Sequence, residues 1–395
     1  MNHAEVQSLD RRFSRGWTVL SLIDLLLLTA GFLLVRHLRD PRYGGIWILK
    51  VGTVMVYQQL FLLRNRKRIL SGANLDKIWG VANILSLSRG VLIALLAGFL
   101  FTQRPSGIVG WLPALLYTTL ATLDFFDGYW ARRTNTQTTM GELLDQEYDA
   151  LGILIAVILV IQWDQLPVAF LYVGLAKYVF AWGISWRKSR GQAVYPLPSS
   201  YMRRRLAGFQ MGILAVFLWP IARPPGTLLA ELIIGVPLLL GFIRDWLLVS
   251  GALDPEDEGY RKIKGIFYRV GRIWLPVILR GAFAAAMVII AATAFRPDSF
   301  PAAWITAYLP QSGLLTVIYA VARLLLLLVL VAGRFTSTSA LLLLLLEGLR
   351  IFLSRLDPLG AAIVTATLLL YLFGPGRYRL GVRPPARPTS DPVSS

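Results

Sequence analysis

The chain contains no cysteine and only two histidines among its 395 residues, and charged residues make up only 16% of it. Without cysteine there is no disulfide, no thiolate metal site and no cysteine nucleophile. With only His3 and His37 there is little scope for a histidine-ligated metal or a Ser-His triad. Any metal site in this chain is therefore expected to use oxygen ligands.

Apolar residues dominate the composition. The chain is 56% hydrophobic with a mean hydropathy of +0.60, which is above the range of soluble domains. Apolar runs of about twenty residues recur along it, whereas a β-barrel would show alternating strands of about ten residues. The sequence therefore predicts an all-α, polytopic membrane protein. The first run, residues 17–35, is too long for a secretory signal and lacks a small-x-small cleavage site, so we interpret it as a retained helix.

Twelve apolar windows predict membrane spans near residues 17–35, 44–63, 81–101, 107–128, 143–162, 166–185, 206–222, 227–249, 273–294, 313–333, 338–353 and 359–375. Composition shifts then divide the chain into five parts. These are an N-terminal two-helix segment (1–80), a six-helix core (81–253), a charged linker (254–272), a C-terminal four-helix bundle (273–376) and a disordered tail (377–395).

The net charge of +18 could indicate nucleic acid, but the basic residues lie in short clusters beside the apolar runs. That pattern is typical of membrane topology and anionic lipid, so no nucleic acid is expected as a partner. Five clusters fall on one side of the predicted topology, and the positive-inside rule places that side and both termini in the cytoplasm of a multi-pass cell-membrane protein. The loop at 36–42 carries three arginines on the opposite side, so the first two spans are the least secure part of this topology.

The stretch LDFFDGYWARRTNTQTTMGELLDQEYDA, residues 123–150, is acidic although it joins two apolar spans. Asp124 and Asp127 share a face of one helix end, and Asp145 and Asp149 share a face of the next. If these ends meet, four carboxylates converge and repel unless cations lie among them; oxygen-only ligands suit Mg²⁺ or Mn²⁺. Such an ion near the membrane surface indicates a phosphate-bearing ligand. Charge places this stretch on the cytoplasmic side.

Small and basic residues accompany the acids. Gly128 and Gly141 leave room for a ligand or a close backbone approach, and Arg132, one turn beyond Gly128, can pair with a phosphate oxygen. Glu147 is expected to point away from the face of the aspartates, either behind them or in solvent. The alternative interpretation is that the acids are surface charges paired with Arg132 and Arg133.

The pattern D-x2-D-G-x2-A-R-x8-G-x3-D-x3-D resembles the signature of the CDP-alcohol phosphatidyltransferase family. Its fixed positions are all met, by Asp124, Asp127, Gly128, Ala131, Arg132, Gly141, Asp145 and Asp149. The resemblance covers about residues 81–250 and implies the family's six-helix core. It further implies that Asp124, Asp127 and Asp145 bind the divalent metal and that Asp149 is the general base. The same resemblance assigns Gly128, Ala131, Arg132 and Gly141 to the nucleotide.

The activity that the resemblance implies belongs to phospholipid biosynthesis. A phosphatidyl-type group passes from CDP-diacylglycerol or a similar CDP-lipid, held in the lipid bilayer, to an alcohol acceptor, and CMP is released. Members of the family often work as dimers, so a homodimer is implied as well, although the residues themselves carry no sign of it. The acceptor stays open among inositol phosphate, glycerol phosphate, serine, choline and other alcohols.

Two further stretches are similar to family members. ANILSLSRG resembles the opening of the first core helix, with Asn83, Ser86 and Arg89 in matching positions. SSYMRRRLAGFQ lies where many members carry a basic stretch; Arg204 and Gln210 fit, but the family's Gly and Thr are missing, and this departure leaves the acceptor open. Asn83, Arg89 and Arg204 are thus candidates for the substrate pocket, with membrane anchoring as the alternative role of the arginines at 203–205.

A rival interpretation from another class is an ion-coupled transporter that uses the aspartates as its cation site. The acids lie at a helix end rather than at mid-membrane, and the other half of the chain has no matching pair of broken helices, which favours the transferase. A third interpretation, a scaffold for the C-terminal bundle, conflicts with an intact motif.

The predicted C-terminal bundle contains the ionisable residues Arg280, Arg323, Glu347 and Arg350, which are functional hypotheses by default within a membrane. Glu347 and Arg350, three residues apart, are predicted to pair along one helix. The end of the chain, DPLGAAIVTATLLLYLFGPGRYRL, loosely resembles the DoxX-like membrane proteins, and this likeness implies no activity.

Overall fold

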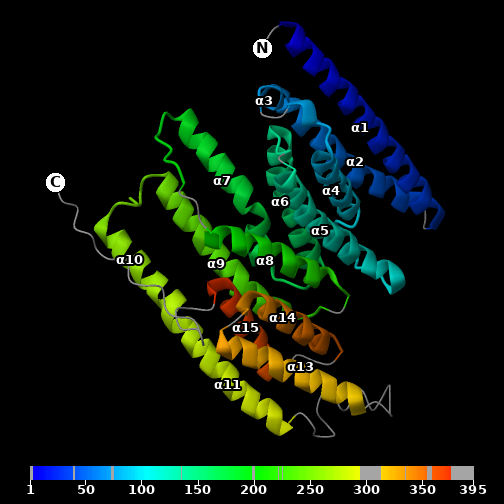
Figure 1. Ribbon diagram of the computed structural model, residues 1–395. Helices are drawn as coiled ribbons and strands as arrows, with labels where there is room; N and C mark the ends of the chain where they lie inside the picture. The colour runs from blue at the N-terminus through cyan, green and yellow to red at the C-terminus, as the bar shows by residue number, and fades with distance from the viewer. Residues whose placement is uncertain are drawn as a thin grey trace, which may run out of the picture. The chain divides into compact units, whose positions relative to one another are not determined.

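A computed structural model describes residues 3–38, 41–72, 75–134, 136–197, 201–220, 222–224, 226–293, 313–333, 335–353 and 358–374 (Figure 1). Within these ranges the chain forms helices and no strand, so the predicted all-α class is confirmed. In the described part of the chain, five helices are long and apolar enough to cross a membrane, and further apolar helices are shorter. The prediction of a polytopic membrane protein is confirmed as well.

The main helices are α1 (His3–Leu38), α2 (Pro41–Arg64), α4 (Val81–Ala97), α5 (Leu112–Arg133), α6 (Thr139–Gln162), α7 (Leu171–Ser189), α8 (Tyr201–Leu218), α9 (Gly226–Val249), α11 (Leu275–Thr293), α13 (Gly313–Ala332), α14 (Thr336–Leu353) and α15 (Pro358–Phe373). Each of the twelve predicted windows overlaps one of them. Shorter elements are α3 (Arg66–Leu70) and α10 (Glu258–Arg269), the latter followed by a π-helical turn (Val270–Trp274). The segment expected as a linker, 254–272, is therefore mostly helical.

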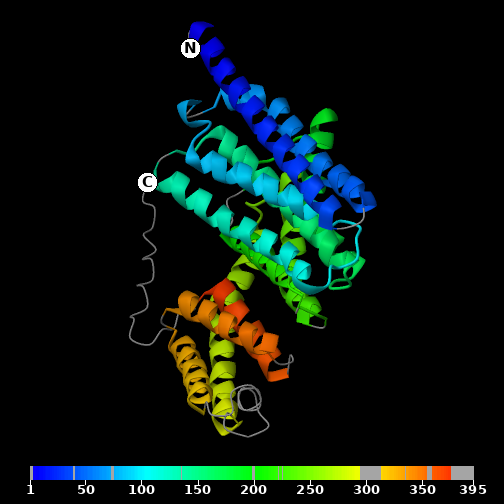
Figure 2. The ribbon, with the colours of Figure 1, turned by 90° about the vertical axis from the view of Figure 1, so that its right-hand side faces the viewer.

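The described residues fall into two compact units, one of residues 1–194 and 206–243, the other of residues 195–205 and 244–395. In the first unit α1 runs along α2, and α2 packs against α4 (Figures 1 and 2). Val51 and Met55 of α2 and Ala94 of α4 form the buried centre of that contact. Helix α4 also packs against α5 and α6, so it lies among the helices that carry the acidic stretch.

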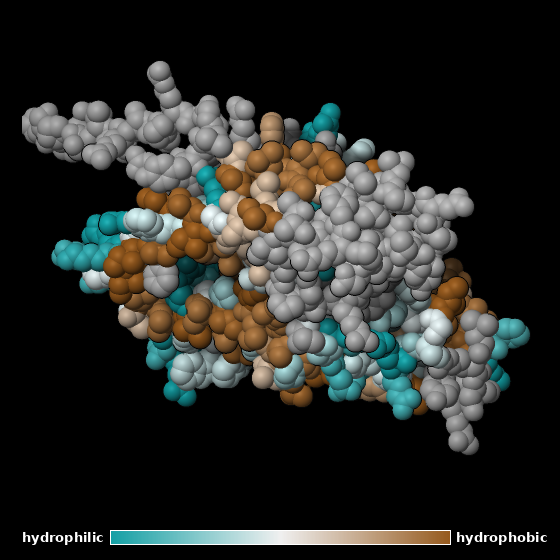
Figure 3. Space-filling model, turned by 90° about the horizontal axis from the view of Figure 1, so that it is seen from below, coloured by the Kyte–Doolittle hydropathy of each residue, from teal (hydrophilic) through white to brown (hydrophobic). Residues whose placement is uncertain are grey.

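Close packing in the first unit depends on small residues where helices cross. A Cβ added to Gly174 of α7 would lie 2.9 Å from the Cα of Leu154 in α6, so a larger residue would push the two helices apart. Away from these contacts, Leu26 and Leu49 are more than half exposed, as expected for side chains that face lipid. In Figure 3, which views the whole chain from below, hydrophobic residues form broad areas of the part of the surface that is not grey.

The second unit has its own apolar core, formed where α11, α13, α14 and α15 pack together. Glu347 of α14 is fully buried and accepts a hydrogen bond from Arg350 Nε at 2.8 Å, which confirms the predicted pair. Its other oxygen accepts from Arg323 Nε of α13, which the sequence did not predict. Two guanidinium groups therefore share one carboxylate inside this bundle.

Candidate functional site

The start of α6 is fixed by a cap and by a contact with α4. Thr138 has an extended backbone, and its Oγ1 accepts a hydrogen bond from Gly141 N at 2.9 Å, so it caps the helix. Buried Asn83 of α4 donates to Thr138 Oγ1 at 2.8 Å and to the carbonyl of Ile78 at 2.7 Å. A Cβ on Gly141 would lie 2.7 Å from Asn83 Oδ1, so this position needs glycine. These contacts fix where α6 begins relative to α4.

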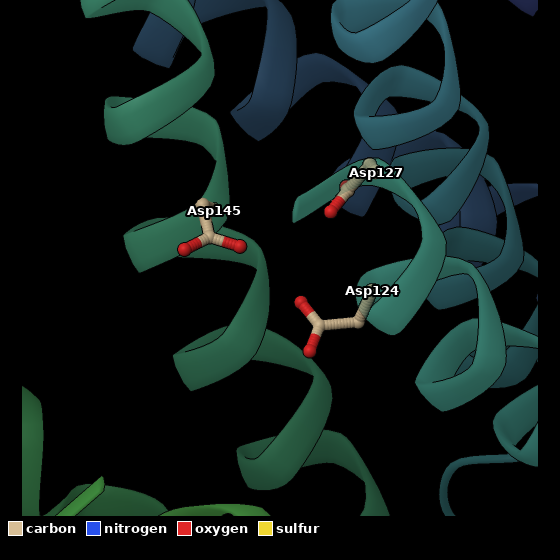
Figure 4. A group of neighbouring side chains, drawn as sticks. All are labelled: Asp124, Asp127 and Asp145. Carbon is tan, nitrogen blue, oxygen red and sulfur yellow. The ribbon is translucent and has the colours of Figure 1, made fainter. Parts of the chain in front are cut away.

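The aspartates of α5 and α6 point toward one another. Figure 4 shows Asp124 and Asp127 on one helix facing Asp145 on the other. One oxygen from each lies within 4.8 Å of the others. Asp127 is buried at 5% exposure, whereas 52% of the Asp145 side chain is exposed, so the group is accessible on its α6 side. The structure thus brings together the residues that the resemblance assigned to metal.

Arg89 of α4 lies among these carboxylates and is fully buried. Its guanidinium is 2.7 Å from Asp124 and 3.1 Å from Asp127. It is also 3.2 Å from Asp145 and forms an ion pair with Asp149. Sequence analysis had placed Arg89 only in the substrate pocket; the structure places it at the centre of the acidic group, where it links α4 to both helices of the motif.

One guanidinium offsets the charge of only one carboxylate, and four carboxylates this close together attract further positive charge. Among the described residues, Ser86 Oγ also donates a hydrogen bond to Asp127 Oδ2 at 2.9 Å. The atoms that could bind a metal ion are all carboxylate oxygens, and part of the group is exposed to an incoming ion. These residues therefore fit a hard divalent cation such as Mg²⁺ or Mn²⁺.

The structure describes some of the other predicted site residues in full and only the backbone of the rest. Gly128 follows Asp127 directly in α5, and Gly141 lies in the first turn of α6. The side chains of Ala131, Arg132 and Arg204 lie outside the described part of the chain, although their backbones belong to α5 and α8. Their assignment to nucleotide and acceptor stays a prediction.

Glu147 lies off the aspartate face, as expected, but it is buried rather than solvated. Its Oε1 accepts hydrogen bonds from Tyr57 of α2 at 2.6 Å and from Tyr178 of α7 at 3.1 Å. Lys177 Nζ is 3.6 Å from its Oε2. No local pattern could reveal this cluster, because its members come from three separate helices.

The structure is that of a polytopic helical membrane protein with a group of carboxylates between two helix ends. Residues 79–243 match the family model of the CDP-alcohol phosphatidyltransferases, and this match confirms the resemblance that the motif predicted. Residues 79–243 are therefore similar to the CDP-alcohol phosphatidyltransferases, a family of membrane transferases of phospholipid synthesis. No curated protein and no solved structure matches the chain.

Proposed function

We propose that the protein transfers a phosphatidyl-type group from CDP-diacylglycerol or a similar CDP-lipid to an alcohol, with release of CMP. The observation that carries this proposal is the convergence of the motif's aspartates from α5 and α6 around Arg89. It occurs inside the region that matches the family. We place the catalytic core at residues 81–253 and its acidic group on the cytoplasmic side, as the distribution of basic residues suggests.

In this proposal Asp124, Asp127 and Asp145 hold the divalent metal. Bound there, Mg²⁺ or Mn²⁺ would supply positive charge to the diphosphate of the CDP-lipid. Gly128, Ala131, Arg132 and Gly141 surround the cytidine nucleotide; this list follows the family motif.

Asp149 acts as the general base. It accepts the proton of the acceptor hydroxyl, whose oxygen attacks the β-phosphorus. The bond from that phosphorus to the bridging oxygen breaks, and CMP leaves with this oxygen. Arg89 orients the Asp149 carboxylate through their ion pair while 35% of the Asp149 side chain stays exposed toward an incoming alcohol.

The proposal is tested by measuring CMP release from the full chain in detergent with CDP-diacylglycerol, Mg²⁺ or Mn²⁺ and a panel of alcohols. We expect one alcohol to stimulate release and Asp149→Asn to lower it by at least roughly 10²-fold. Glu142→Gln is the matched control, because Glu142 is an exposed acid in the same helix. Tight Mn²⁺ binding without CMP release for any alcohol would refute the transferase and favour the carrier.

A further inference from the structure

Helix α2 lies outside the region that matches the family. Two of its consecutive side chains, Tyr57 and Gln58, nevertheless form hydrogen bonds with α6 and α4, two of the helices that carry the acidic group and Arg89. Gln58 is buried at 5% exposure, and its Nε2 donates to the carbonyl oxygen of Gly90 in α4 at 3.0 Å. Gly90 directly follows Arg89. A side chain of α2 is therefore bonded to the backbone beside the residue that contacts all four aspartates.

Tyr57, the preceding residue, reaches α6 instead. Its hydroxyl donates to Glu147 Oε1 at 2.6 Å. Glu147 lies midway between Asp145 and Asp149, on the opposite face of the same two turns. Because Glu147 also accepts from Tyr178 of α7, it is held from both sides, and its position determines how α6 is rotated about its axis.

The packing around these two residues explains why they can act on the site. Val51, Met55, Gln58 and Leu62 recur at helical spacing and are all buried, so they form the face of α2 that packs toward α4. A buried amide without a partner is destabilising, so the Gln58 bond selects one register of α2 against α4. The fixed α2 then presents Tyr57 to Glu147.

We infer that Tyr57 and Gln58 are positioning residues that hold α4 and α6 so that Arg89 meets Asp145 and Asp149. Helices α1 and α2 are on this account a working part of the catalytic unit rather than an added membrane anchor. The inference rests on the proposed function. A displacement of about 1 Å at a reacting group lowers rates by as much as roughly 10²-fold, so small rotations of α6 suffice to slow the transfer.

Gln59 provides a matched control. It is the next residue of α2 and the same residue type, and its Nε2 donates to Asp24 of α1 at 2.6 Å, away from the acidic group. Gln58→Leu and Gln59→Leu each remove one such bond from the same helix. Tyr57→Phe removes only the hydroxyl that binds Glu147.

The experiment compares CMP release, thermal unfolding and Mn²⁺ affinity by electron paramagnetic resonance for the full chain and the variants Tyr57→Phe, Gln58→Leu and Gln59→Leu. We expect Tyr57→Phe and Gln58→Leu to lower kcat by roughly tenfold with little change in KM, and Gln59→Leu to stay within about twofold of wild type. Equal kcat in all three variants would overturn the inference. The inference would also be overturned if, across the three variants, kcat fell in proportion to the unfolding temperature, because lost stability alone would then explain the lower rate.

The two proposals fail in different ways. If the wild-type chain releases no CMP, the proposed function is wrong, and the role of α2 is then decided by metal affinity alone. Mn²⁺ binding weakened in Tyr57→Phe and Gln58→Leu but not in Gln59→Leu would support positioning. Equal Mn²⁺ affinity in the wild-type chain and all three variants would overturn it.

Discussion

Replacing Arg89 with methionine should make the protein dependent on divalent metal for its stability. Methionine keeps an unbranched stem of similar length but removes the charge, so the four aspartates lose the cation that they share. Breaking a buried ion pair costs roughly 3–5 kcal/mol. Because 29%, 52% and 35% of the Asp124, Asp145 and Asp149 side chains are exposed and screened by solvent, we expect the lower end, about 3 kcal/mol.

For a domain of this size, about 3 kcal/mol corresponds to a drop of roughly 6–12 °C in the unfolding temperature. The assay is thermal unfolding in detergent with EDTA and again with Mn²⁺. Metal that binds only the folded chain should restore part of the loss, because it replaces the missing positive charge.

The control is Arg66→Met, which breaks the partly exposed pair with Asp10 in the same unit. A pair of that kind contributes less than about 1 kcal/mol, so its unfolding temperature should change little. If Arg89→Met were as stable as wild type in EDTA, or no less stable than Arg66→Met, the account of the acidic group would be refuted.

Two further substitutions test the packing around the site and in the second unit. Gly141→Ala should lower both CMP release and the unfolding temperature, because its Cβ would lie 2.7 Å from Asn83 Oδ1. The control Gly208→Ala, whose Cβ has no neighbour within 4 Å, should leave both quantities unchanged or raise the unfolding temperature slightly. If the two variants had the same CMP release and the same unfolding temperature, this reasoning would be wrong. Glu347→Gln should lower the free energy of unfolding by roughly 3–5 kcal/mol in chemical denaturation, because the buried guanidiniums of Arg323 and Arg350 lose their carboxylate. The control Glu258→Gln, which removes an exposed ion pair, should leave the denaturation midpoint unchanged. Equal shifts of the midpoint in the two variants would contradict the stabilising role of Glu347.

The helices could be predicted from the sequence because hydrocarbon requires long apolar segments with internal backbone hydrogen bonds. Helix α10 was missed as an element because its charged residues suggested a polar linker, although Ile263 and Ile266 recur at a helical spacing between them. Spacings of three and four residues placed each pair of aspartates on one face of its own helix, because local geometry governs that placement. The sequence left open whether the two faces meet, and the structure shows that they do.

The contacts of Arg89, Glu147 and Arg323 could not be predicted in the same way. Arg89 meets Asp145 across 56 residues of chain, and Arg323 meets Glu347 across 24. Tyr57 and Glu147 are separated by 90 residues. Pairs of this kind depend on which helix faces pack together, and periodicity within one helix carries no information about its neighbour.

The most direct test of the central claim is to measure CMP and new phospholipid together in liposomes that contain the full chain, CDP-diacylglycerol, Mn²⁺ and the alcohol that stimulates best. The account predicts that the two products appear in equal amounts and that Asp149→Asn abolishes both. Movement of a cation across the liposome membrane with neither product formed would contradict it.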